Sequence, residues 1–279
     1  MAAFKPGNSV KTIASLVLLF IWLAPAAANA AAPGTEVDLE LVLAVDTSRS
    51  IDADEVALQR AGYIAAIRHP DFIEAIKTGF RGRIALSYFE WAGQVRQETL
   101  VPWQVIDSVE SAGAFADKIG ATTVTPSLRG TSISSALIYA TGLIGAASYA
   151  EDRRVIDVSG DGPNNIGSPV SDARDAALSA GIVINGLPML VRPSPTYKHL
   201  DRYYADCVIG GPGSFMLPVY DMSEFATAIR RKLILEVSAA EPPARLIPVA
   251  ATVEEPVDCL KGERDRRLFS DPYFPELDK

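Results

Sequence analysis

Short apolar segments alternate with segments of helical periodicity along most of the chain. Six of the seven residues at 39–45 are apolar, which is typical of a strand buried on both faces of a sheet. A tight turn at Ala92 and Gly93 indicates that the segment after it is an antiparallel edge strand. The predicted strands are residues 39–45, 83–91, 94–102, 153–162, 182–187 and 214–219.

Apolar residues spaced three or four apart predict helices between these strands. One helix follows Asp52, which has Glu55 three residues later as in a capping box, and another ends before Gly181. Strands that alternate with helices predict an α/β fold: a doubly wound, mostly parallel six-stranded sheet with helices on both faces and one antiparallel edge strand. The predicted helices cover residues 56–67, 108–119, 133–144, 172–180 and 223–237.

The periodic pattern is confined to residues 36–238, which we interpret as one domain. Residues 239–279 are rich in proline and charge and show no sustained period. We therefore expect an irregular C-terminal tail after the domain.

Residues 1–30 have the pattern of a secretory signal peptide. Lys5 and Lys11 precede an apolar run at 13–23, and an Ala-x-Ala sequence ends at Ala30. The alternative, a membrane anchor, is disfavoured because eleven residues rising about 1.5 Å each do not cross a bilayer core of about 30 Å. We expect cleavage near Ala30 and an exported chain, periplasmic or secreted, with no membrane span after cleavage.

The net charge is −8 and moves to −10 when the two lysines of the signal segment are removed. An acidic chain without a basic cluster argues against nucleic acid as a partner. The chain has two cysteines, Cys207 and Cys259, and in an oxidising compartment an even pair indicates one disulfide. Such a bond would stabilise the fold by about 4 kcal/mol in the chain-entropy model. Two separate buried thiols are the alternative.

A polar triplet, Asp46, Ser48 and Ser50, follows the first buried strand. Residues two apart in an extended segment face the same way, so one carboxylate and two hydroxyls can converge. This all-oxygen set suits Mg²⁺, with Mn²⁺ and Ca²⁺ as alternatives. Taken alone, such residues also serve as caps and turns.

Two other predicted loops can reach the same edge of the sheet. One carries Thr131 and the other carries Asp161, after a later strand. In a doubly wound sheet these loops lie at the carboxyl ends of the strands, where ligands bind. A threonine hydroxyl and a second carboxylate would complete the protein's share of a cation site.

The segments "LVLAVDTSRSI", "RGTSISSAL" and "VIDVSGDG" resemble the three parts of the metal-ion-dependent adhesion site (MIDAS) of von Willebrand factor A domains. The resemblance covers residues 36–238. The chain is also similar, more loosely, to an exported bacterial group of that superfamily. The resemblance implies metal ligation by Asp46, Ser48, Ser50, Thr131 and Asp161. It also implies that the chain is a binding module rather than an enzyme. The protein or peptide partner of such a module supplies a Glu or Asp carboxylate to the metal. Gly160 departs from the residue that many members carry before the later aspartate.

Residues near these loops are candidates for partner contact, and we assign them to the rim of the site: Arg49, Glu90, Trp91, Asn164 and Asn165. Salt bridges and core packing are the alternative roles for the first three. A metal-dependent hydrolase or phosphotransferase is the rival function, with Ser48 as nucleophile and Asp161 as base. Against it, no histidine, cysteine or lysine lies near the motifs in sequence. A metal kept only to stabilise the fold is the third reading.

Overall fold

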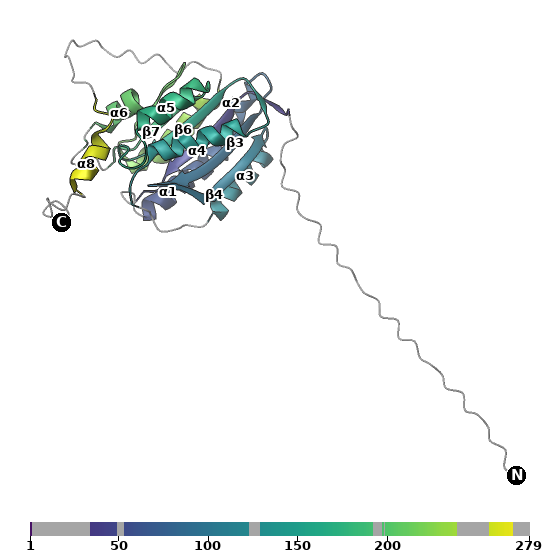
Figure 1. Cartoon of the computed structure of the whole chain (residues 1–279). Coiled ribbons are helices and arrows are strands. Elements are labelled where there is room, and N and C mark those ends of the chain that lie inside the picture. The colour runs from purple at the N-terminus through teal and green to yellow at the C-terminus, as the bar shows by residue number, and fades with distance from the viewer. Residues whose placement is uncertain are drawn as a thin grey trace.

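The computed structural model describes Met1 and residues 34–48, 53–122, 129–191, 197, 199–238 and 257–269. At its centre is a five-stranded sheet in the order β4-β3-β2-β6-β7 (Figure 1). Neighbouring strands are parallel except β3 and β4, which pair antiparallel at one edge. The strands are β2 (Glu40–Asp46), β3 (Ile84–Trp91), β4 (Val95–Ile106), β6 (Arg154–Gly160) and β7 (Val183–Pro188).

Helices cover both faces of this sheet, as the sequence predicts for a doubly wound fold (Figure 1). One face is covered by α1, α2, α3 and α7, and the other by α4, α5 and α6. Their bounds are α1 (Ala53–Ile67), α2 (Pro70–Lys77), α3 (Val109–Ala121), α4 (Ile133–Gly145), α5 (Val170–Ser179), α6 (Leu200–Tyr203) and α7 (Phe225–Val237). A π-helical turn, Tyr204–Val208, continues α6, and a short 3₁₀ turn, Met222–Glu224, precedes α7.

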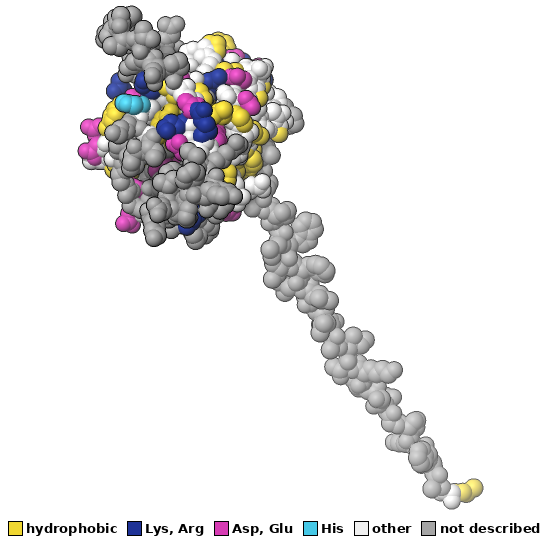
Figure 2. Space-filling view, turned by 60° about the vertical axis from the view of Figure 1, so that its left-hand side comes forward, with side chains coloured by type: hydrophobic (Ala, Val, Ile, Leu, Met, Phe, Trp, Pro, Cys, Tyr) yellow, Lys and Arg dark blue, Asp and Glu magenta, His cyan; other side chains and the backbone are white. Residues whose placement is uncertain are grey.

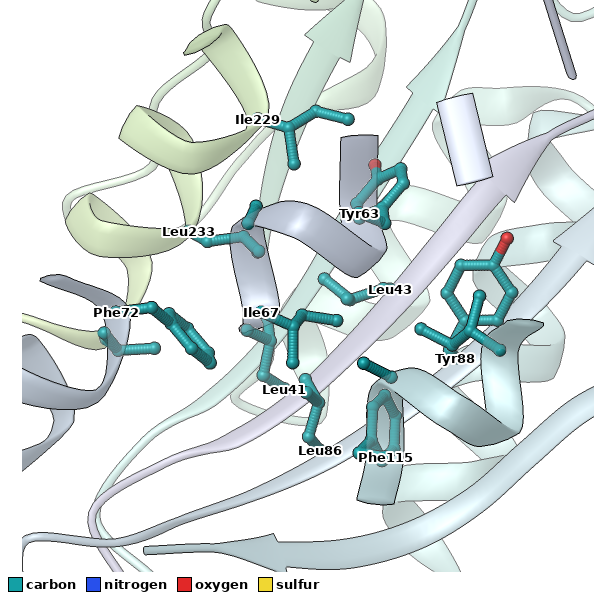
Figure 3. Packing of buried hydrophobic residues seen from close by; sticks show 14 of the residues in the cluster. Leu41, Leu43, Tyr63, Ile67, Phe72, Leu86, Tyr88, Phe115, Ile229 and Leu233 are labelled. Carbon is teal, nitrogen blue, oxygen red and sulfur yellow. The ribbon is translucent and has the colours of Figure 1, made fainter. Parts of the chain in front are cut away.

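Alternation along β2 gives each face of the sheet its own core. Leu41 and Leu43 face α1, α3 and α7, whereas Val42 and Ala44 face α4 and α5. Burial of a leucine or valine side chain stabilises the fold by about 1.5–3 kcal/mol. Figure 3 shows the first core, in which β2 and β3 meet the helices through Leu41, Leu43, Tyr63, Ile67, Phe72, Leu86, Tyr88, Phe115, Ile229 and Leu233.

The sheet has one strand fewer than the six predicted. Residues 214–219 run beside β7 but pair with it only through isolated bridges at Met216 and Val219. Pro188 ends β7, and Pro218 interrupts the neighbouring segment, and neither has an N–H to donate to a regular ladder. A separate two-stranded sheet pairs β1 (Glu36–Val37) with β5 (Ala150–Glu151).

Part of the predicted irregular tail is helical: α8 spans Lys261–Phe269. Its sequence carries mainly charged residues and a glycine, so no apolar stripe marks it as a helix. The predicted disulfide between Cys207 and Cys259 is confirmed and holds this segment beside α6 (Figure 1). The signal segment, apart from Met1, lies outside the described residues. None of the helices in the described ranges has the length and apolar character needed to cross a bilayer.

A buried ion cluster joins β6 and β7 to α7. The Lys232 ammonium lies 2.8 Å from an Asp157 carboxylate oxygen and 2.5 Å from one of Glu236. The Asn185 amide donates to the other Glu236 oxygen at 2.7 Å. All four side chains are buried, so each charge has a partner where an unpaired one would be costly.

Glu40, at the start of β2, is a buried acid at the end of the sheet away from Asp46. Its side chain is 2 % exposed. Burial raises the pKa of Glu40 to about 7, with a further increase from the charge of Glu151 and an opposing effect of Arg154. The folded chain therefore holds a proton here at pH values where the unfolded chain has lost it.

This raised pKa predicts a pH-dependent stability. The free energy of unfolding should fall as pH rises from about 4.5 to about 7, because the folded state binds more protons in that window. Glu40→Gln removes the ionisable group and should raise the free energy of unfolding at pH 8 by about 2 kcal/mol. Urea unfolding at pH 5 and pH 8 measures both effects, with the exposed Glu98→Gln as control. Parallel pH profiles for wild type and Glu40→Gln would contradict the prediction.

Candidate metal centre

The carboxyl ends of β2 and β6 meet at one edge of the sheet. The two strands are parallel neighbours, with Val45 paired to Ser159. The next residues, Asp46 and Gly160, therefore lie side by side, and Asp161 follows immediately. The register of this one strand pair brings the two predicted acidic ligands together.

Asp46 is fully buried at this edge. Its Oδ1 accepts the Ser48 N–H at 2.7 Å, whereas its Oδ2 is buried and has no hydrogen-bond partner among the described residues. Burial raises the pKa of Asp46 well above its usual value, and the charge of Asp161 raises it further. Hydrogen bonds from Ser48 and from the Asp161 backbone oppose this increase. The site thus concentrates negative charge that its own donors only partly compensate.

Thr131 comes to the same edge from the loop before α4. Its N–H donates to Asn165 Oδ1 at 2.9 Å, and its carbonyl accepts the Asn165 N–H at 2.9 Å. Its hydroxyl lies 3.8 Å from the position that a Cβ on Gly162 would occupy. The next residue, Ser132, caps α4 and donates its N–H to the carbonyl of Ala92 after β3. These bonds tie the threonine loop to the ends of β3 and β6.

Gly160, the departure noted in the sequence, has a steric reason. A Cβ at this position would lie 2.7 Å from the Tyr204 hydroxyl and 3.1 Å from Asp46 Oδ2. Tyr204 is fully buried, and its hydroxyl has no hydrogen-bond partner among the described residues. Glycine therefore leaves space for these two buried oxygens, both of which lie close to this position.

These groups fit a hard divalent cation. A buried carboxylate oxygen without a donor, a second carboxylate beside it and two hydroxyls, those of Ser48 and Thr131, form an all-oxygen set. Among the described residues, no three or more His, Cys, Asp and Glu side chains are placed so that they could hold a metal ion by themselves, so hydroxyl oxygens would have to contribute to a site here. The fifth predicted ligand, Ser50, lies outside the described residues.

The structure corrects part of the predicted rim. Glu90 is buried and paired with Arg60, whose Nη2 lies 2.8 Å from Glu90 Oε2. Trp91 is fully buried in the core on the other face of the sheet. Neither side chain can contact a partner from these positions, and the alternative roles in ion pairing and core packing hold for them. Arg49 lies outside the described residues.

Asn164 and Asn165 form hydrogen bonds that hold the segments at the rim together. Asn164 is fully buried, and its Oδ1 accepts the Ser134 N–H at 3.0 Å while its backbone N–H donates to the Tyr203 hydroxyl. Its amide also donates to Glu263 of α8 at 2.7 Å. Sequence reasoning missed this role of α8, because only the two cysteines indicated that the tail returns to the domain.

The comparisons with known proteins agree with this fold. A family model described as "Protein of unknown function (DUF1194)" matches residues 36–241. The chain belongs to this family. No curated protein is similar enough in sequence to match the DUF1194 chain.

Solved structures similar to this DUF1194 chain include a von Willebrand factor type A structure. Proximal thread matrix protein 1 from the mussel byssus is 14% identical with a TM-score of 0.52, and the match covers 74% of this chain and 49% of that one. The pilus adhesin SpaC from Lactobacillus rhamnosus GG is 10% identical with a TM-score of 0.54, over 73% and 31%. A von Willebrand factor type A protein from Catenulispora acidiphila is 14% identical with a TM-score of 0.51, over 72% and 43%. The chain thus spans less than half of each, and the similarity establishes the von Willebrand factor A fold.

The close packing at Gly160, the last residue of β6, predicts that alanine lowers stability there much more than at Gly162, two residues further along the chain. Gly160→Ala should lower the free energy of unfolding by about 1–3 kcal/mol, because buried Tyr204 and Asp46 must move to admit a methyl group. Gly162→Ala meets only the Thr131 hydroxyl, at an ordinary contact distance of 3.8 Å, and should change stability by less than about 0.5 kcal/mol. Urea unfolding measures both variants. Equal effects would show that Gly160 is not constrained by its neighbours.

Proposed function

We propose that this chain is a divalent-cation-dependent binding module that recognises an acidic group on a protein or peptide partner. The observation that carries the proposal is the buried Asp46 Oδ2, which has no donor among the residues that the structure describes and lies next to the charge of Asp161. A buried carboxylate in this position is stabilised either by a proton or by a compensating positive charge. A divalent cation supplies that charge with ligands of the kind present.

The proposed ligands are those of the adhesion-site pattern: Asp46, Ser48, Ser50, Thr131 and Asp161. Two carboxylates and three hydroxyls suit Mg²⁺, with Mn²⁺ and Ca²⁺ as alternatives. A bound cation would offer an electrophilic position to an oxygen of an acidic partner. One structure of the mussel thread protein, which shares the fold, has a zinc-occupied MIDAS motif. That finding supports a cation site at the corresponding edge of this domain.

Binding, rather than catalysis, is favoured by the groups around the site. Both cysteines are joined in the disulfide, so neither offers a thiolate. His69 caps α2 and lies 2.9 Å from an Arg230 nitrogen, on the face of the sheet opposite Asp46. The adhesin among the similar structures is consistent with an interaction role. We further propose export through the N-terminal signal segment, with cleavage near Ala30.

Titration calorimetry with Mg²⁺ and Mn²⁺ tests the proposal. Wild type should bind one cation, and Asp46→Ala and Ser48→Ala should each weaken binding by at least about tenfold, because each removes a proposed ligand. Asp172→Ala removes an exposed carboxylate on α5 and serves as a control for charge alone. Circular dichroism should show that all variants stay folded. Unchanged cation affinity in both site variants would refute the assignment.

A further inference from the structure

The segment that contains α8 is fastened to the rim of the candidate site at several points, one of which is the hydrogen bond from the Asn164 amide to Glu263. Cys259 forms the disulfide with Cys207, and its carbonyl accepts a hydrogen bond from the Tyr203 hydroxyl at 3.4 Å. Gly262 packs so closely on Asn164 that a Cβ would lie 2.2 Å from the Asn164 carbonyl oxygen. We call residues 257–269 the C-terminal strap.

A further point of attachment places the guanidinium group of Arg266 beside the loop that carries Thr131. Arg266 Nη1 donates to Asn165 Oδ1 at 3.2 Å. The same oxygen accepts the Thr131 N–H at 2.9 Å. Arg266 Nη1 also lies 2.7 Å from the position of a Cβ on Gly130, the residue before Thr131. The guanidinium of the strap and a proposed metal ligand therefore share one side-chain oxygen.

The other basic residues of the strap with described side chains are paired with its acids. Lys261 lies 3.0 Å from an Asp265 oxygen, and Arg264 forms an ion pair with Asp258. For Arg266, no carboxylate partner is found among the described residues, and its side chain is half-buried. Figure 2 brings this side of the molecule forward and shows Lys and Arg side chains next to Asp and Glu side chains. Among the strap residues with described side chains, Arg266 is thus the cation that has no carboxylate partner and lies at the rim.

We propose that Arg266 is a second recognition point, which binds a second acidic group of the same partner beside the cation site. The inference rests on the proposed function, which supplies the first point. A guanidinium presents paired N–H donors that match a carboxylate, and one nitrogen bonded to Asn165 leaves other donors for a ligand. The partner this geometry fits is an acidic peptide segment with at least two Glu or Asp side chains.

The test uses fluorescein-labelled, C-terminally amidated peptides of two classes: Gly-Gly-Glu-Gly-Gly-Gly, and a set in which a second glutamate replaces the glycine one, two or three residues further on. Binding is measured by fluorescence anisotropy in the presence of Mn²⁺. Wild type should bind the best two-glutamate peptide at least about tenfold more tightly than the one-glutamate peptide. Arg266→Gln should bind the two classes within about twofold of each other. The glutamine amide still has an N–H to donate to Asn165, so the strap can stay in place.

Arg264→Gln is the matched control, since Arg264 lies on the same helix, is exposed and pairs with Asp258. It should keep the wild-type preference for two glutamates. Equal preference in Arg266→Gln and Arg264→Gln would overturn the inference while leaving the proposed function intact. Failure of wild type to bind Mn²⁺ would instead refute the proposed function. Binding of Mn²⁺ without a preference for two glutamates in wild type would again overturn the inference alone.

A second variant tests the strap as a unit. Cys207→Ser with Cys259→Ser removes the tether and should reduce the two-glutamate preference toward that of Arg266→Gln, because α8 loses its covalent attachment. Mn²⁺ affinity, measured in parallel, separates this effect from damage to the cation site. A preserved preference in the untethered chain with intact Mn²⁺ binding would contradict the role of the disulfide in presenting Arg266.

Discussion

The burial of Asp46 next to Asp161 is the constraint on which the rest of this edge of the domain depends. The parallel register of β2 and β6 forces the two strand ends together, and the sheet then removes Asp46 from water. Backbone N–H groups of Ser48 and Asp161 offset only part of the resulting increase in pKa. An acid held in this way favours either a proton or a cation. The hydroxyls of Ser48 and Thr131 suit the cation, because they add neutral oxygen ligands without further negative charge.

The surrounding structure fixes these oxygens by linking each loop to a different element. Tyr204 fills the space beneath Gly160, and its helical turn also carries Cys207 of the disulfide. Asn164 joins the start of α4 to α6 and to the strap. On the opposite face, β6 is bound to α7 through Asp157 and Lys232. The strand that presents Asp161 is therefore held from both sides, which limits how far the site can relax when its charge changes.

Sequence alone predicted the features that depend on local pattern. The apolar run of β2 and the helical stripe of α4 gave the fold, and the disulfide followed from cysteine parity. Alternation along β3 places Trp91 in one core and turns Glu90 toward Arg60 on the other face. The rim prediction for these two residues was wrong because the burial of a strand's last residues depends on which elements pack over them. The strap was missed for a similar reason. Its helix is held by a disulfide and by polar contacts to Asn164 and Asn165, none of which leaves a periodic signal.

The overall negative charge of the chain would limit how the proposed acidic partner is recognised. A net charge of −8 repels such a partner at long range, although at physiological salt this repulsion is screened beyond about 8 Å. Attraction must then come from a small positive centre that acts at contact distance. A divalent cation beside two carboxylates provides little net charge, whereas Arg266 adds one full positive charge at the same rim. Under the proposed function, recognition would therefore rest on short-range geometry, in which the spacing of two acids on the partner is decisive.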